Sequence, residues 1–322
     1  MEKVEKQVIG STNAPLLLAK KKYVKKIFSK PMMIGYIFLL PSLLILCIVG
    51  IYPLIQTIYL SFFDVSFTKQ GSSFVGLENY RNLLSDIWFK VAYKNTWIFT
   101  VLSVLLETIL GLFIALVLNK NFKGRGLVRA CVLIPWAIPT VVSARMWEWI
   151  FNAEYGILNF LLMKVGIIDA NINWLGETST AMSAAIFSDV WKTTPFMALI
   201  ILAGLQGISS SLYEAADIDG ANKWKQFFYL TLPLLVPSIM IAVLLRSLDA
   251  FRVFDLIFVL TGGGPANSTE VLSSYAYKTT FSAAQVSYGA AMSSLMAVSV
   301  FILAMVMLFF MNQSSKKIEG GK

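Results

Sequence analysis

Long apolar runs dominate this chain of 322 residues. Six of them reach the roughly 20 residues that a helix needs to cross the hydrocarbon of a bilayer. With 57% hydrophobic and 14% charged residues, the chain also has too few polar side chains to cover a soluble globule. We therefore predict an all-α membrane protein with spans at 34–63, 97–118, 130–151, 181–206, 234–260 and 288–312. Pro41 and Pro53 predict kinks in the overlong first span.

Lysine and arginine residues predict the orientation of these spans. Residues 1–33 contain eight lysines, 119–129 contain four basic residues and the tail 313–322 contains three. Because cytoplasmic loops carry such an excess, both termini are predicted to be cytoplasmic, with the segment 64–96 outside. The same excess accounts for the net charge of +9, so no nucleic-acid partner is expected.

Several residue types and motifs that carry chemistry are missing. The chain has no histidine, the commonest zinc ligand and proton shuttle, and no Gly-x-x-x-x-Gly-Lys-Ser/Thr nucleotide loop. Its two cysteines, Cys47 and Cys131, fall inside predicted spans, where we expect them to be buried and unpaired. We therefore predict no catalytic residue, metal site or cofactor on this chain, and any ATP and magnesium would be bound by another polypeptide.

A polar segment separates the fourth and fifth predicted spans. Ser211 and Glu214 have the spacing of a capping box, and Gly220 suits the left-handed end of a short helix at 211–220. About two turns of helix are marginal in water, which indicates that something outside the chain holds this helix. The aromatic residues after it are predicted to pack beneath the spans: Trp224, Phe227, Phe228 and Tyr229.

Ionisable residues within spans are costly and mark functional positions. In the fifth predicted span they recur every three residues, which predicts pairing within the helix of Arg246 with Asp249 and of Arg252 with Asp255. A row with this spacing winds around a helix, so we expect that the four cannot all face one pore. Two interpretations stay open: a substrate path, or charge pairing that fixes the packing of the spans.

Other charged positions are interpreted from their place in the predicted spans. Asp189 and Lys192 form an i, i+3 pair beside Trp191, where a gating role and simple anchoring at the interface stay open. Arg145 and Glu148 are predicted to form an interfacial ion pair. Glu107 is predicted to form a buried hydrogen bond between helices, with a neutral acid as one alternative.

One spaced motif resembles that of a known family. Glu214-Ala215-Ala216 is followed after three residues by Gly220 and then, after nine residues, by Leu230-Thr231-Leu232-Pro233. This pattern resembles the signature of permease subunits of binding-protein-dependent ABC importers, of the carbohydrate type related to the maltose and glycerol-phosphate permeases. Only Leu230, in place of isoleucine, departs from it. Shorter resemblances lie at 76–80, 95–96, 219–221 and 263–265.

The resemblance implies a type I ABC importer transmembrane domain in the plasma membrane, with a core at 97–312. Two copies of an ATPase, a second related permease and an extracytoplasmic binding protein would be its partners, and a carbohydrate its substrate. The short helix would be a coupling helix that contacts the ATPase through residues of the motif: Glu214, Ala215, Ala216, Asp217, Gly220, Leu232 and Pro233. The candidate sugar contacts are Asp249, Arg252, Asp255, Trp191 and Lys192.

An alternative class fits the same charges. A stand-alone carrier driven by an ion gradient would use ionisable residues in its spans as the coupling site. The two three-span halves of this chain share no motif and no matching Gly/Pro interruptions, which weakens the interpretation as an inverted-repeat carrier.

Overall fold

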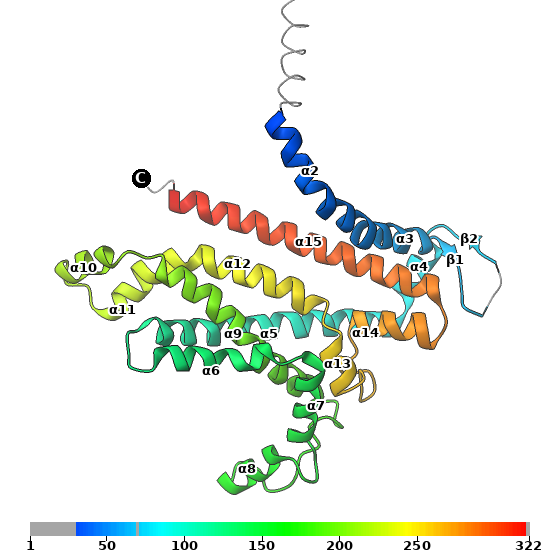
Figure 1. Ribbon diagram of the computed structural model, residues 1–322. Helices are drawn as coiled ribbons and strands as arrows, with labels where there is room; N and C mark the ends of the chain where they lie inside the picture. Colours follow the sequence, from blue (N-terminus) through cyan, green and yellow to red (C-terminus); the bar gives the residue numbers. More distant parts are fainter. Residues whose placement is uncertain (1–29, 69–70, 320–322) are drawn as a thin grey trace, which may run out of the picture. The chain divides into compact units, whose positions relative to one another are not determined.

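The computed structural model describes residues 30–68 and 71–319 (Figure 1). The predicted basic segment up to residue 29 and the last three residues of the predicted tail lie outside these described residues. Two compact units divide the chain between Thr57 and Ile58, and each is described by itself.

The first unit contains the apolar helix predicted at 34–63. Its segments are α2 (Lys30–Ile45), a π-helical turn η1 (Leu46–Ile51) and α3, which begins at Tyr52 and ends at Leu60. The π-helical turn lies just before Pro53, where the missing N–H and the ring disturb the regular ladder of hydrogen bonds. Pro41 is accommodated inside α2. Cys47 is exposed, and so is Cys131 in the second unit, so the prediction that both are buried is wrong.

The second unit begins with a short hairpin and is otherwise helical (Figure 1). Strands β1 (Phe63–Asp64) and β2 (Ser73–Phe74) pair antiparallel, with Phe63 opposite Phe74. The helices that follow are α4 (Glu78–Ser85), α5 (Ile87–Asn119), α6 (Arg125–Ala137), α7 (Thr140–Ile150), α8 (Ile157–Val165), α9 (Ala181–Gln206), α10 (Ser210–Ile218), α11 (Lys223–Gln226), η2 (Phe227–Thr231), α12 (Leu232–Phe251), α13 (Asp255–Leu260), α14 (Leu272–Tyr277), η3 (Lys278–Ser282) and α15 (Val286–Glu319).

Within the described residues, five helices are long and apolar enough to span a membrane, and the pair α6 and α7 makes a sixth if it is one bent span. The predicted span 181–206 has the bounds of α9. α5 begins ten residues before the prediction, because the Asp86 carboxylate caps it by accepting a hydrogen bond from the Trp88 N–H at 2.8 Å. The predicted segment 64–96 therefore contains the first turns of this span.

Two predicted spans are interrupted. α6 and α7 meet at an angle of 92° around Pro139, which has no N–H to donate and which keeps Ile138 extended, so a single helix at 130–151 is wrong. The helix predicted at 234–260 ends at Phe251. Arg252 has φ −105° and ψ 20°, and α13 begins at Asp255.

Close helix packing forms the centre of the second unit. α9 lies along α5, and α12 packs against both of them and against α15 (Figure 1). Gly111 permits the closest approach of α5 to α9, since a Cβ there would lie 2.8 Å from the Cβ of Met197. At one end of these helices are α10 and α11, and at the other end are α13 and α14 (Figure 1).

Candidate functional site

Two parts of the second unit combine exposure with charge. The first is the elbow, defined here as residues 209–233, which contains α10, α11, η2 and the start of α12. The second is a charged cleft at the break between α12 and α13.

Both ends of α10 are closed by hydrogen bonds within the elbow. Ser209 is its N-cap, and its Oγ accepts from the N–H of Ser211, so the predicted capping box of Ser211 with Glu214 is wrong by two positions. At the other end Gly220 has φ +73°, and the N–H of Ala221 donates to the carbonyl of Ala216 at 2.9 Å. This is a Schellman ending, which requires the left-handed conformation that glycine adopts readily.

Asp217 fastens α10 to α11. Its carboxylate accepts hydrogen bonds from the amide of Gln226 and from Lys223 Nζ, the latter at 3.1 Å. The bonds from Gln226 and then from Lys223 hold the pKa of Asp217 below its ordinary value of 3.8. Tyr213 and Thr231 add a second link, with 3.0 Å between their hydroxyl oxygens. The elbow is therefore a unit fixed to the base of α12.

The remaining motif residues sit around this unit. Glu214 is exposed, and no described residue hydrogen bonds or pairs with its carboxylate. Ile218, one turn further on, is 87% exposed. Ala215 is exposed and Ala216 half-buried. Leu232 and Pro233 form the first turn of α12, where a proline loses no hydrogen bond.

The aromatic residues after α10 face outward. Trp224, Phe228 and Tyr229 are exposed, and the rings of Trp224 and Phe228 stack at 6.2 Å. Gln226 lies on the inward face of this segment. It is buried, and its amide donates hydrogen bonds to Asp217 and to the carbonyl of Ala221. Residues two positions away point to the opposite side of a helix. The prediction that the rings pack beneath the spans is therefore wrong for these three, whereas the fourth ring, that of Phe227, is half-buried.

The charged cleft has a volume of about 250 Å³. α6, α9, α12 and α13 surround it, because the bend at Pro139 brings Trp136 to it and the break after Phe251 turns the chain around it. Four predicted contact residues line it: Lys192, Asp249, Arg252 and Asp255. Trp191 points elsewhere and packs edge-on against Trp147, with 5.5 Å between ring centroids.

Arg246 lies at the floor of this cleft and is only 3% exposed. Its Nε lies 2.7 Å from Oε2 of Glu107 on α5, an ion pair rather than an aligned hydrogen bond. Its Nη2 donates to the other oxygen of Glu107 at 3.0 Å and also to Asp189 on α9. One arginine therefore joins three helices.

This arrangement confirms the predicted pair of Arg246 with Asp249 and corrects the other two predicted pairings. Asp189 pairs with Arg246 rather than with Lys192. Asp249 lies 3.4 Å from Arg246 and 3.5 Å from Arg252, so Arg252 pairs with Asp249 rather than Asp255.

The row of four charges from Arg246 to Asp255 does reach a single cleft, because α12 ends after Phe251. The expectation that the row could not face one pore assumed a continuous helix.

Two predictions about buried and exposed polar groups are confirmed. Glu107 accepts a hydrogen bond between helices from the Thr193 hydroxyl at 2.7 Å. Arg145 and Glu148 form an exposed ion pair at 2.6 Å. Sequence reasoning missed Trp136, Thr140 and Phe254 as lining residues of the cleft. Pro139 was the available signal for Trp136, since a proline there predicts the bend that places it.

Fold and site together define a helical membrane protein with a charged cleft between its spans and an exposed elbow at one end of them. Residues 107–320 match the family described as "Binding-protein-dependent transport system inner membrane component". The chain belongs to this family, and it is the permease subunit of an ABC importer.

Two curated relatives are similar over most of their length. The trehalose/maltose transport system permease protein MalF of Thermococcus litoralis is 49% identical, over 76% of this chain and 82% of that protein. The sulfoquinovosyl glycerol transport system permease protein SmoG of Agrobacterium fabrum is 39% identical, over 85% of this chain and 87% of that protein.

A solved structure shares the fold. A chain of a bacterial ABC transporter involved in the import of the acidic polysaccharide alginate is 26% identical, with a TM-score of 0.78. The match covers 91% of this chain and 99% of that one. Interrupted and bent helices are therefore compatible with the fold of an importer permease.

Proposed function

We propose that this permease forms one half of the path for a neutral mono- or oligosaccharide, and that motion reaches it from separate ATPase subunits through the elbow. The single observation that carries this proposal is the elbow itself. The carboxylate of Asp217 accepts hydrogen bonds within the elbow, whereas Glu214 and Ile218 point outward from a helix fixed to α12. Such a surface fits a cleft on another subunit.

The partners follow from the family and from the expectations above. A second related permease would complete the path, an extracytoplasmic binding protein would deliver the sugar, and two ATPase subunits would bind ATP and magnesium beneath α10. This arrangement requires α10 and both termini on the cytoplasmic side, as the lysine distribution predicts.

Charge balance in the cleft supports a neutral cargo. Lys192 and Arg252 line it together with Asp249 and Asp255, so these lining residues offer no excess of positive charge to an acidic sugar. Among the relatives, the trehalose/maltose permease is named after two neutral sugars. We propose Asp249, Arg252, Asp255 and Lys192 as sugar contacts, and we assign Trp191 to packing because it turns away from the cleft.

The coupling role is tested in liposomes that contain the assembled transporter. Glu214→Arg together with Gly220→Trp should abolish ATP-driven sugar uptake and the stimulation of ATP hydrolysis by loaded binding protein. The matched control is Glu154→Arg with Gly166→Trp, because Gly166 also ends a helix with positive φ in open space but lies after α8. This control should transport normally.

The same uptake measurement distinguishes the ATP-driven importer from the alternative class, a stand-alone carrier driven by an ion gradient. Uptake that persists in the elbow variant and follows a proton or sodium gradient would support a stand-alone carrier. Equal loss in the elbow variant and in the control would contradict a specific role for the elbow.

The sugar contacts are tested by Asp249→Asn and Arg252→Gln. Loss of a charged hydrogen bond typically costs about 1.5–3 kcal/mol, so we expect sugar affinity during transport to fall about tenfold or more. Arg145→Gln is the control, since its ion pair with Glu148 is exposed and outside the cleft. Unchanged affinity and rate in folded cleft variants would contradict this assignment.

A further inference from the structure

Aromatic rings extend from the charged cleft, first as a cluster of three and then as two single rings. We call them the ring series: Phe254, Phe258, Tyr277, Phe281 and Phe67. Phe254, Phe258 and Tyr277 form a triangle, with centroids separated by 5.1 Å from Phe254 to Phe258, by 5.3 Å from Phe258 to Tyr277 and by 5.2 Å from Phe254 to Tyr277. Phe281 lies 5.0 Å from Tyr277. Phe67 follows at 6.3 Å from Phe281. These spacings are comparable to the length of one sugar ring.

Four rings of the series are exposed and Phe254 is half-buried, although an apolar core lies beside them. On α13, Leu256, Ile257 and Leu260 are buried in that core, while Phe254 and Phe258 occupy the other face one turn apart. Exposure rises along the series, with 39% for Phe258, 40% for Tyr277, 62% for Phe281 and 66% for Phe67. Exposed aromatic surface of this extent indicates a binding surface.

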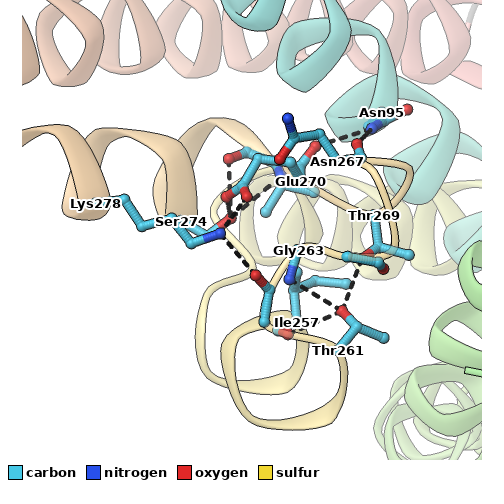
Figure 2. Close-up of polar contacts among 12 residues, drawn as sticks. Asn95, Ile257, Thr261, Gly263, Asn267, Thr269, Glu270, Ser274 and Lys278 are labelled. Carbon is cyan, nitrogen blue, oxygen red and sulfur yellow. Dashed lines mark hydrogen bonds and ion pairs between the residues drawn. The ribbon is translucent and has the colours of Figure 1, made fainter. Parts of the chain in front are cut away.

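Polar contacts hold the segments that carry the rings (Figure 2). Lys278, next to Tyr277, donates to the carbonyl of Gly262 at 2.6 Å and pairs with the buried Glu270, so the end of α13 is tied to the start of η3. Ser274 adds a hydrogen bond to Glu270 at 2.6 Å. At the far end, the N–H of Phe67 donates to the carbonyl of Ala284 at 3.1 Å. The segments that carry the ring series are thus fixed by these polar contacts.

Both ends of the ring series open onto polar clefts. Phe254 lines the charged cleft. At the other end, Phe67 lies between Ser66 and Thr68, which line a second cleft of about 310 Å³ together with Asn79 and Gln285. Hydroxyl and amide groups of this kind hydrogen bond to sugar hydroxyls.

We propose that the ring series is a track on which a sugar moves from the second cleft to the charged cleft. This proposal rests on the proposed function, because it assigns a substrate path to the same permease. The apolar C–H face of a sugar ring packs on an aromatic face, while its hydroxyls stay free to exchange hydrogen bonds. The cluster of Phe254, Phe258 and Tyr277, followed by Phe281 and Phe67, therefore offers successive weak sites rather than one strong site.

The surroundings of the rings favour a sugar over lipid as occupant. Asp255 lies between Phe254 and Phe258 in sequence and is exposed beside them at the cleft. A carboxylate is costly in contact with hydrocarbon chains but compatible with a hydrated, hydroxyl-rich ligand. The rings also lie between two polar clefts, which likewise favours a sugar over a lipid as the occupant.

The test compares ring with non-ring substitutions in the assembled transporter. Phe258→Leu and Phe281→Leu keep apolar bulk but lose the flat face, so kcat/KM for sugar uptake should fall at least threefold, more for a tetrasaccharide than for a disaccharide. Phe258→Tyr and Phe281→Tyr should transport like the parent protein. Phe113→Leu removes an equally exposed ring from α5 and is the matched control.

Each outcome decides a separate point. Leu variants that transport both sugars like the parent would overturn the track, as would Tyr variants that lose as much as Leu variants. ATP hydrolysis stimulated by loaded binding protein shows that each variant is folded and coupled. A parent protein that moves no sugar would overturn the proposed function, and the track with it.

Discussion

Arg246 of α12 and Glu107 of α5 are buried together, with 2.7 Å between Nε and Oε2, although 139 positions separate them in the sequence. Asp189 of α9 bonds to the same guanidinium. α5, α9 and α12 are therefore joined at the floor of the charged cleft, which α9 and α12 line. Any movement of α12 relative to α5 and α9 must carry these charges along or separate them.

Removal of the guanidinium should destabilise the protein strongly. Arg246→Met leaves two buried carboxylates without their cation, which typically costs about 3–5 kcal/mol. We expect a clear fall in the thermal unfolding midpoint of the purified protein in detergent. Arg145→Met, which breaks an exposed pair, should change stability by about 1 kcal/mol or less. Similar midpoints for the two variants would contradict a joining role for Arg246.

The end of α10 should depend on the left-handed conformation of Gly220. A Cβ at this position meets nothing within 4 Å, so Gly220→Ala tests the backbone conformation alone, at a cost of about 1–2 kcal/mol. Gly220→Asn should lose less stability than Gly220→Ala, because asparagine tolerates positive φ. Gly126→Ala, inside α6 and also in open space, should be neutral or stabilising. Hydrogen exchange of the α10 amides measures the difference, and equal protection in all three variants would argue against this account.

Acid should weaken the cap of α5 through Asp86. Partial burial raises the pKa of this carboxyl, but hydrogen bonds from Tyr275, from the N–H groups of Trp88 and Phe89, and from Tyr288 outweigh burial and hold it below 3.8. A lowered pKa in the folded state means that Asp86 contributes its full stability above about pH 4 and loses it as the pH falls through the lower folded value.

Asp86→Asn isolates this contribution, since asparagine still caps a helix but does not titrate. The variant should be less stable than the parent at pH 6, and the difference should shrink as the pH falls toward 3. Unfolding midpoints across this range provide the measurement. A difference independent of pH would show that the charge of Asp86 has no part in it.

The loop before α14 should not accept a side chain at Gly263. This residue has φ +84°, and a Cβ there would meet the Glu270 carboxylate and lie 2.9 Å from Lys278 Nζ (Figure 2). Gly263→Ala should therefore disturb the Glu270–Lys278 pair. It should lower the free energy of unfolding by about 1–3 kcal/mol, in addition to the cost of placing alanine at positive φ. Gly262→Ala, with φ +60° and only an ordinary contact of 4.0 Å to the carbonyl oxygen of Phe258, measures that backbone effect alone. Equal stability of the two variants would contradict the packing described here.

Local sequence patterns predicted the spans but not their interruptions. α9 has the predicted bounds because its apolar run is bordered by polar residues at both ends. The bend at Pro139 was missed because apolar composition continues across it, and the break at Arg252 was missed because the predicted span included the charged residues from Arg246 to Asp255. Once α12 ends at Phe251, charges that would wind around a longer helix meet in one cleft.

The partners of buried charges came from distant elements. Spacing within one helix predicted Arg246 with Asp249 as a pair, but two buried carboxylates from α5 and α9 approach the guanidinium more closely. No local pattern encodes such contacts. Gly220, by contrast, was predicted as a left-handed helix end, because that requirement is local to the chain.

Crosslinking from α10 tests the central proposal most directly. In a background with Cys47→Ser and Cys131→Ser, Glu214→Cys should crosslink to the ATPase subunit in membranes that contain the assembled transporter. Gln285→Cys, an exposed position at the α14 end, should give no such product. An ATPase crosslink from Gln285→Cys, or none from Glu214→Cys in an intact complex, would contradict the transfer of motion through the elbow.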